Sequence, residues 1–406
     1  MELVSSVWHI FSATLVFGTG MVIAIKLAKS FGVAEKRSVS IYLWHTIFCF
    51  VYAQYALTNV SDAAGYYATS LSQNIEFSLG TAGVGILTQF LSSMLDLSFL
   101  GAFLVFNIFG FIGLLAFDAS LRAATWNKSK NIRRLATLVI FLPSVSFWSS
   151  AIGKDALSFM ATGLALWSVL NLRRRVWLMI IAIFVMLLVR PHIAGLMVLA
   201  IAGSMVMQKK VSLAQRALVG GVAFAGAALL IPIALNYSGF GGDGGATDLG
   251  AYIEKRQGYN QEGGGGIDIS AMSPPMQLFT YLFRPLPFEA HSVFSLAASL
   301  DNLVLLFLFV WGGREMIKRR KRQKQAYSEN RMFLWIYSLS AWLILSVTTA
   351  NLGISVRQKW MFAPMLIFLF ISVIGRPRQH AAEQRPSVRG QSPVQTSLRV
   401  NRVQKP

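Results

Sequence analysis

The sequence predicts an all-α, polytopic integral membrane protein with about eleven transmembrane helices. Three observations predict this class: 54% of the 406 residues are hydrophobic, only 13% are charged, and long apolar runs alternate with short basic linkers. A soluble globular domain carries about 25% charged residues, whereas a membrane span needs about 20 mostly apolar residues. We therefore interpret the net charge of +20 as a topology signal and expect no nucleic-acid partner.

The predicted spans follow one another along residues 1–375. They cover residues 3–25, 40–58, 97–117, 135–151, 156–172, 176–189, 193–207, 217–235, 293–312, 332–350 and 360–375. The first is expected to be a retained span, because it is too long for a signal peptide and is preceded by Glu2 with no Lys or Arg. The single cysteine, Cys49, excludes an intramolecular disulfide.

Basic residues predict the orientation of the chain. The linkers 26–37, 122–134, 173–175, 209–216 and 314–325, together with Arg331 and the tail after residue 375, hold 30 of the 37 Lys and Arg residues. Cytoplasmic loops are enriched in these residues, so the N-terminus is expected outside and the C-terminus inside. Seven basic residues then remain outside: Lys154, Arg190, Lys255, Arg256, Arg284, Arg357 and Lys359.

Two outer regions and one tail complete the organisation. Residues 59–96 are expected to form an outer loop whose amphipathic second half lies along the membrane interface as a helix. Residues 236–292 form a Gly-rich outer loop, which is either a cover over a binding site or a tolerated insertion. Residues 376–406 are polar and basic and are expected to be a disordered cytoplasmic tail.

The stretch "LVRPHIAG" places Arg190, Pro191 and His192 between two short apolar runs. Proline ends the incoming helix and frees backbone groups. Because the flanking runs are short, Arg190 is expected below the outer membrane surface, where a charge requires a cavity or a partner. We expect an anion site in an outward-facing cavity. The alternative is a turn whose arginine reaches the lipid phosphates.

The same arrangement recurs at three other outer turns. Lys154 and Asp155 lie between two spans, Arg284 and Glu289 precede the span at 293–312, and Arg357 and Lys359 precede the last span. The planar arginine guanidinium suits phosphate oxygens, so these residues predict one anionic ligand in the outer leaflet. The alternative is that they pair with the outer acids.

A transferase needs a base that deprotonates an acceptor hydroxyl. Asp62, in "SDAAGYY", is the first candidate, and Tyr66 in the same stretch is expected to contact substrate. Asp155, His192 and Glu289 are further candidates, although each has a structural alternative: a helix cap, a turn contact or a partner for Arg284. Asp301, within a predicted span, is a costly carboxylate that is expected to face the cavity.

Three motif classes do not occur in the sequence: Gly-rich nucleotide loops, His/Cys clusters at metal-ligand spacing, and nucleophile elbows. No metal ligands are assigned and no cofactor is required, but the sequence does not exclude the use of a divalent cation.

Six stretches carry a family resemblance over most of residues 58–375. They are "SDAAGYY", "LGTAGVGILTQFLSSMLDL", "PSVSFWSSAIGKDAL", "LVRPHIAG", "FRPLPFEAH" and "SVRQKWMFAPML". The chain resembles GT-C-fold sugar transferases and the O-antigen or exopolysaccharide polymerases of bacteria. In the GT-C class an acidic residue in an early outer loop is the base, which Asp62 matches, although here it follows the second span and not the first.

The resemblance implies a transferase in the bacterial inner membrane. It would move a sugar or repeat unit from an undecaprenyl-linked donor to a glycan acceptor at the outer face, among membrane lipids and other polysaccharide-assembly proteins. Outer arginines would hold the lipid pyrophosphate, which Arg190, Arg284 and Arg357 match. A transporter or flippase for lipid-linked glycans and a noncatalytic envelope partner remain alternatives.

Reporter fusions test the predicted topology. A reporter in the basic linker 26–37 and one in the loop 236–292 are expected to lie on opposite sides of the membrane, because basic linkers stay in the cytoplasm. Enzymatic reporters that are active on only one side give the readout. Two fusions on the same side would contradict the orientation.

Overall fold

The computed structural model describes residues 2–72, 75–207, 265–319 and 330–375, with a few isolated residues between 221 and 258. Most of the predicted span at 217–235, residues 236–252, 255–256 and 259–264 of the Gly-rich loop, which include Lys255 and Arg256, and the tail 376–406 lie outside the described residues.

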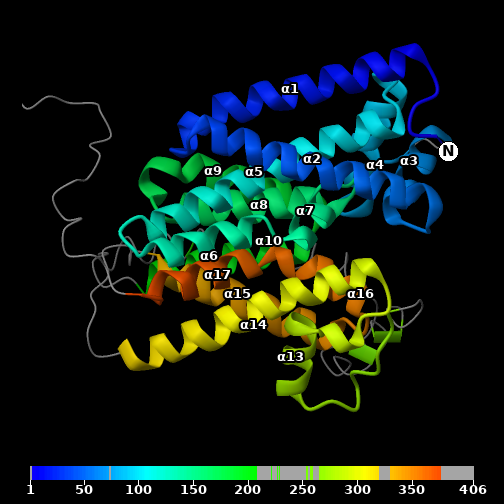
Figure 1. Cartoon of the computed structure of the whole chain (residues 1–406). Helices are drawn as coiled ribbons and strands as arrows, with labels where there is room; N and C mark the ends of the chain where they lie inside the picture. Colours follow the sequence, from blue (N-terminus) through cyan, green and yellow to red (C-terminus); the bar gives the residue numbers. More distant parts are fainter. Residues whose placement is uncertain are drawn as a thin grey trace, which may run out of the picture.

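The described part of the chain is helical, apart from one isolated bridge between Gly266 and Asn351. The helices run roughly alongside one another, with α3, α4 and α16 at one end of the bundle (Figure 1). In order they are α1 (Val7–Phe31), α2 (Glu35–Thr58), α3 (Asp62–Ser72), α4 (Thr81–Gln89), the π-helix η1 (Phe90–Met94), α5 (Phe99–Thr125), α6 (Lys130–Ile140), α7 (Pro143–Ser149), α8 (Lys154–Val169), α9 (Leu172–Val189), α10 (Pro191–Val206), α13 (Pro274–Phe283), the 3₁₀ turn η3 (Pro287–Glu289), α14 (Val293–Arg319), α15 (Arg331–Thr348), α16 (Leu352–Gln358), the 3₁₀ turn η4 (Lys359–Met361) and α17 (Ala363–Val373).

The protein has the helices of a multi-pass membrane protein. Five stretches of the described residues are long and apolar enough to cross a membrane: α1, α5, α6 with α7, α14 and α15. A sixth is the pair formed by α16 with η4 and α17, which is bent by 63°. Shorter helices account for part of the difference from the predicted eleven spans: α8 and α10 have 16 residues each, fewer than a full crossing needs.

Prolines set the helix boundaries that matter for the site. Pro143 divides the predicted span 135–151 into α6 and α7, and Pro191 separates α9 from α10. Proline has no N–H and is tolerated only in the first turn of a helix, so each of these residues begins a new helix. Pro364 similarly lies in the first turn of α17, directly after the bend.

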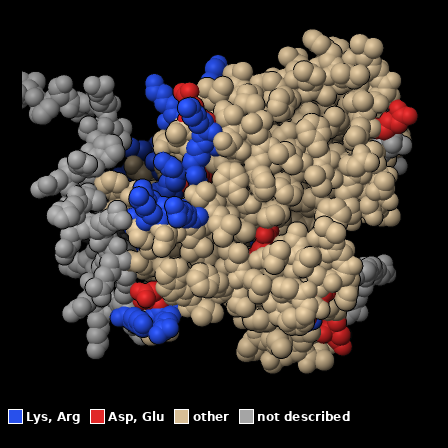
Figure 2. Space-filling model, in the orientation of Figure 1, with Lys and Arg blue, Asp and Glu red and all other residues tan. Residues whose placement is uncertain are grey.

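The two ends of the bundle differ in charge. Figure 2 shows that Lys and Arg side chains gather at one end of the molecule. This is the end where α1 meets α2, α5 meets α6 and α8 meets α9, and where α14 ends, so the predicted basic linkers 26–37, 122–134 and 173–175 lie together with the described start of 314–325. The opposite end carries α3, α4 and the turns with Lys154, Arg190 and Arg357.

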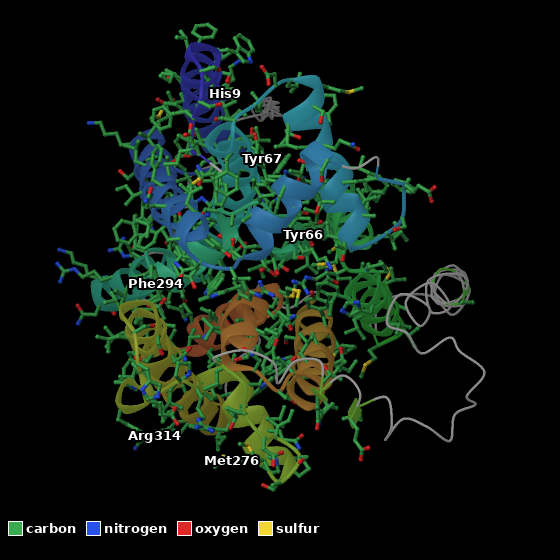
Figure 3. The ribbon with its side chains drawn as sticks, turned by 90° about the vertical axis from the view of Figure 1, so that its right-hand side faces the viewer. His9, Tyr66, Tyr67, Met276, Phe294 and Arg314 are labelled. Carbon is green, nitrogen blue, oxygen red and sulfur yellow. The ribbon has the colours of Figure 1, made fainter. Side chains whose placement is uncertain are left out.

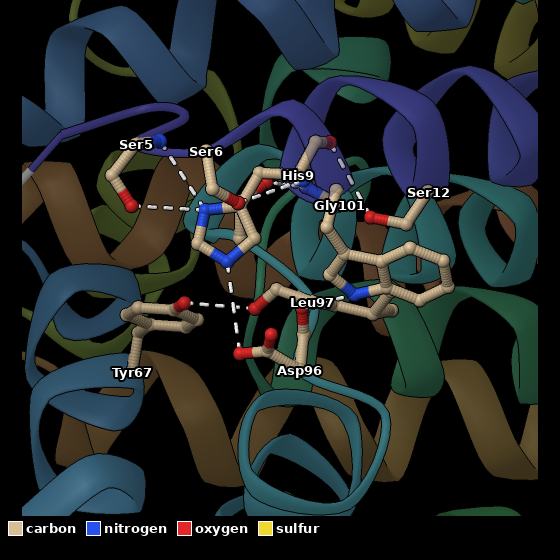
Figure 4. Close-up of polar contacts among 10 residues, drawn as sticks. Ser5, Ser6, His9, Ser12, Tyr67, Asp96, Leu97 and Gly101 are labelled. Atoms are coloured by element: carbon tan, nitrogen blue, oxygen red, sulfur yellow. Dashed lines mark hydrogen bonds and ion pairs between the residues drawn. The ribbon is translucent and has the colours of Figure 1, made fainter.

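The second half of residues 59–96, predicted to be helical, forms α4 and the π-helix η1, and the first half adds α3, which was not predicted; together they form a layer, the α3–α4 layer. Its attachment to α1 and to the residues before α5 is polar (Figure 4). His9 Nε2 lies 3.7 Å from Asp96 Oδ1, Trp8 Nε1 donates to the Asp96 carbonyl at 3.1 Å, and the Tyr67 hydroxyl donates to the Leu97 carbonyl at 2.8 Å. These contacts fix the layer on the end of the bundle.

Helices α5 and α8 pack closely because both carry glycine at their crossing. A Cβ added at Gly163 would lie 2.3 Å from the Gly113 carbonyl oxygen, and one added at Gly113 would lie 2.8 Å from Met160 Cα. Small residues allow such a close approach between membrane helices.

Gly163→Ala is therefore expected to destabilise the protein by about 1–3 kcal/mol, the usual cost of overpacking. Gly18→Ala in α1 is the matched control, because nothing lies within 4 Å of a Cβ at that position. Thermal unfolding in detergent measures both. Equal melting temperatures for the two variants would contradict the close crossing.

Candidate functional site

A cavity of about 910 Å³ lies at the end of the bundle that carries α3 and α4. Figure 3 views the molecule from this end, with Tyr66 of α3 near the middle of the face. Six of the residues predicted from the sequence to form the site line this cavity: Asp62, Tyr66, Lys154, Asp155, Arg190 and Arg357.

A chain of ion pairs crosses the cavity wall. Arg190 Nη2 donates to Asp155 Oδ1 at 2.6 Å, and Arg357 Nη1 donates to Asp62 Oδ2 at 2.6 Å. Arg357 Nε lies 3.8 Å from Asp155 Oδ2, so the order is Asp62, Arg357, Asp155, Arg190. The chain joins α3, α16, α8 and the α9–α10 break, which lie far apart in the sequence.

The two carboxylates have different environments. The Asp155 side chain is 18% exposed and is held by Arg190, which also donates from Nε to Ser158 Oγ at 3.1 Å. The Asp62 side chain is 61% exposed, and among the described residues only Arg357 pairs with it. Asp62 is therefore the carboxylate with an oxygen open to a ligand.

Helix N-termini make the cavity attractive to anions. Its lining side chains are formally neutral, since Lys154, Arg190 and Arg357 balance Asp62, Glu76 and Asp155. However, α4 begins at Thr81 and α8 at Lys154, both in the lining, and α10 begins directly after Arg190. None of these three helices has a side-chain cap. The dipole of each helix favours a negative charge at its N-terminus.

The turn before α8 depends on glycine. Gly153 has φ +155° and ψ −179°, a backbone region that is almost restricted to glycine. It directs the first turn of α8 into the cavity, where Lys154 Nζ donates to Thr81 Oγ1 at 2.7 Å. Lys154 thus connects the bundle to the α3–α4 layer.

Aromatic side chains form another part of the wall. Tyr52, Tyr66 and Trp148 line the cavity beside the charged groups. Burial, together with the nearby Asp62 carboxylate, raises the pKa of Tyr66 above its ordinary value, so its hydroxyl stays protonated and can donate a hydrogen bond. Apolar and aromatic walls with a few convergent polar groups are typical of small-molecule sites.

The third arginine lies in a second cavity of about 750 Å³. Arg284 Nη2 lies 2.5 Å from Glu289 Oε1, and Glu289 Oε2 accepts the Leu286 N–H at 2.7 Å. Burial would raise the pKa of Glu289, but the bonds from Arg284 and Leu286 outweigh it and hold the pKa below its ordinary value. This pair therefore stabilises the fold above the ordinary glutamate pKa and loses its contribution as the pH falls through the lowered value.

The second cavity is largely apolar and adjoins the first. Its walls include Tyr55, Phe147, Phe288 and Phe294, and Trp148 lines both cavities. Helix α16 lies between them, because Val356 faces the second cavity and Arg357 the first. The expected convergence of three arginines on one cavity thus holds for Arg190 and Arg357, while Arg284 occupies the neighbouring one.

Two predicted site residues line neither cavity. His192 lies in the first turn of α10. Lys359 is fully buried in η4, where its Nζ bonds to Asn302 Oδ1. Asp301, which was expected to face the cavity, is 2% exposed and accepts the Ser144 N–H at 2.7 Å. In this conformation none of the three reaches a ligand in either cavity.

Sequence reasoning missed several lining groups. Tyr52 is an ordinary residue of a predicted span, and Trp148 and Thr81 lie in stretches that resemble the transferases but were not singled out as site residues. Ser158 does not line the cavity but is buried beside Arg190, and it had a usable signal, since it lies three residues after Asp155 on the same helix face. The residues that the structure describes contain no group of three or more His, Cys, Asp or Glu side chains able to hold a metal ion.

Comparisons of the chain with protein-family models, with curated proteins and with solved structures find no match.

Asp155→Asn and Asp62→Asn are expected to differ in stability. Asn at position 155 leaves the buried Arg190 guanidinium without its carboxylate, and breaking a buried pair costs about 3–5 kcal/mol. Loss of the more exposed Asp62 partner is expected to cost about 1 kcal/mol or less. Melting temperatures in the same detergent decide this, and an equal loss in both variants would contradict the assigned burial.

Proposed function

We propose that the protein is a glycosyltransferase of GT-C-like architecture with about eleven spans in the bacterial inner membrane. It transfers a sugar or repeat unit from a polyprenyl (pyro)phosphate donor to an acceptor hydroxyl at the outer face. The observation that carries this proposal is the combination in one cavity of an accessible carboxylate, Asp62, with Arg190, Arg357 and uncapped helix N-termini.

Asp62 is the general base of the proposed reaction. Its open oxygen accepts the proton of the acceptor hydroxyl while the hydroxyl oxygen bonds to the anomeric carbon of the donor. The bond from that carbon to the phosphate oxygen breaks, and the electron pair leaves with the phosphate. Arg357, 2.6 Å from the other Asp62 oxygen, holds the carboxylate in one orientation, as a base requires.

Lys154, Arg190 and the N-termini of α4 and α8 hold the departing phosphate. Donors fixed before the reaction stabilise charge that develops in the transition state. Asp155 positions Arg190 through the 2.6 Å contact between Nη2 and Oδ1. The phosphate would share the guanidinium with Asp155, and the arginine fork can serve two anions at once.

The neighbouring apolar cavity supports an amphiphilic donor. The first cavity has six charged side chains for the phosphate and sugar. The second has two, Arg284 and Glu289, among mostly apolar and aromatic residues that suit the hydrocarbon chain of a lipid-linked substrate. Trp148 lines both cavities, and the exposed side chains of Phe288 and Phe294 lie at the second. The chain would enter there from the lipid and pass Trp148 toward the first cavity.

Asp62→Asn tests the base. The variant is expected to bind the lipid-linked donor normally but to turn over about 10²–10⁴-fold more slowly, which is the usual contribution of a general base. Asp96→Asn is the control, because Asp96 is 76% exposed and lines neither cavity. The measurement is chain extension of an acceptor by purified protein supplied with undecaprenyl-linked sugars.

The same purified protein and lipid-linked sugars also distinguish a transferase from a transporter. Near-normal transfer by Asp62→Asn would remove Asp62 from the mechanism. If the wild-type protein extends no acceptor but moves the lipid-linked glycan across a vesicle bilayer, the transferase proposal fails and the transporter alternative replaces it.

A further inference from the structure

Two adjacent polar residues, Asp301 and Asn302, lie in the apolar helix α14. Their side chains are 2% and 0% exposed. Burying such groups in a membrane-spanning helix costs free energy unless each is hydrogen-bonded. Their partners therefore indicate what the two residues do.

Each partner lies at an interruption of the helical structure. Asp301 Oδ2 accepts the Ser144 N–H at the start of α7, and Asn302 Nδ2 donates to the Pro285 carbonyl at 2.9 Å. Asn302 Oδ1 accepts from Lys359 Nζ at the bend between α16 and α17. The two residues thus connect α14 to three interruptions: α6–α7, the turn after α13 and α16–α17.

Each interruption also carries residues of the two cavities. Pro285 follows Arg284 directly, and Lys359 is two residues after Arg357. The third segment, α7, includes Trp148 of both cavities. Asn302 contacts both of the segments that carry these arginines: its amide N–H donates to the Pro285 carbonyl, and its amide oxygen accepts from Lys359.

We propose that Asn302 and Lys359 form a positioning unit that fixes Arg357 in the first cavity relative to Arg284 in the second. Neither residue touches a ligand in either cavity. The inference rests on the proposed function only for the ligand's chemistry, an amphiphile that occupies both cavities. The mechanical link between the arginines is independent of it.

Fold stability alone is a weak explanation for this arrangement. Replacing buried ionic groups by apolar residues of similar volume is often neutral or stabilising. The Lys359 ammonium group must be placed so that it can donate to Asn302, and an apolar side chain would impose no such requirement. The same chain has another buried lysine, Lys128, whose Nζ donates to the carbonyls of Ile371, Ser372 and Ile374 near the other end of α17.

Three substitutions separate the two contacts of the unit. Lys359→Met removes the contact behind Arg357 and keeps the Asn302–Pro285 bond. Asn302→Asp keeps an oxygen for Lys359 but loses the donor to Pro285, and Asn302→Leu loses both contacts. Lys128→Met is the matched control at the other end of α17.

The first readout is the rate at which phenylglyoxal modifies each arginine, followed by mass spectrometry of the full-length protein in phosphatidylcholine nanodiscs. Lys359→Met is expected to speed modification of Arg357 several-fold and to leave Arg284 unchanged. Asn302→Asp is expected to do the reverse, and Asn302→Leu to speed both. The Lys128→Met control is expected to change neither rate, even where it lowers the melting temperature.

Unchanged rates in all three variants, or the same changes in Lys128→Met, would overturn the proposal. If Lys359→Met does not fold because Asp301 loses a nearby opposite charge, Asp301→Asn combined with Lys359→Met gives the same test without an unpaired charge. The rates involve no ligand, so they stand even if the transferase proposal fails.

The second readout is the affinity for undecaprenyl phosphate in the same nanodiscs. Asn302→Leu is expected to weaken binding more than Lys359→Met or Asn302→Asp does. The first cavity, proposed for the phosphate, and the second cavity, proposed for the hydrocarbon chain, then lose their fixed spacing. Loosened arginines with unchanged affinity would show that the link exists but serves no ligand spanning both cavities, and the positioning role would be withdrawn.

Discussion

The ion pair between Arg190 and Asp155 is the contact on which the first cavity depends. Arg190 is 8% exposed, and a charge that far from water persists only with a partner. Asp155 supplies that partner from the first turn of α8 and also lies 3.8 Å from Arg357. One carboxylate thus places two arginines, so the cavity is organised before any ligand arrives. The other carboxylate, Asp62, is 61% exposed and bonds to Arg357 through one oxygen, which leaves its second oxygen accessible.

Helix interruption is the means by which the chain brings these groups to one end. Continuous spans satisfy all their backbone groups internally and offer nothing to a ligand. Pro143 and Pro191, with Gly153, begin or direct the helices that lead to the cavity, and the starts of α4, α8 and α10 are left without side-chain caps. Of these interruptions, the one at Pro143 is contacted from α14 by Asp301, and Asn302 of the same helix contacts two others, at Pro285 and at Lys359.

The sequence was sufficient to identify five of the six charged residues of the first cavity, with Glu76 as the exception. Basic residues outside the predicted cytoplasmic linkers are rare, so Lys154, Arg190 and Arg357 stand out by position alone, and the structure brings all three together. It was not sufficient for Lys359 or Arg284. Lys359 lies two residues from Arg357 but on the opposite side of a tight 3₁₀ turn, where it is buried. Arg284 is separated from Arg357 by the width of α16. Both outcomes depend on side-chain direction within short helical turns, which hydropathy and charge patterns do not specify.

The number of spans was similarly difficult to predict, because α8 and α10 are apolar but shorter than a full membrane crossing.

The pairing of acids and arginines also decides how a ligand could bind. Of the two outcomes considered from the sequence, the structure shows pairing with the acids: each of Arg190, Arg284 and Arg357 has a carboxylate partner. A site that held unpaired arginines would attract any anion from solution. In the observed arrangement an anion must share a guanidinium with Asp155 or Asp62 and must also use the helix N-termini. Selectivity then comes from geometry rather than from net charge, because an anion that cannot reach both kinds of donor gains little in exchange for a weakened ion pair. A phosphate fixed to a long hydrocarbon chain, delivered beside the cavity from the membrane, meets that condition better than a free phosphate does.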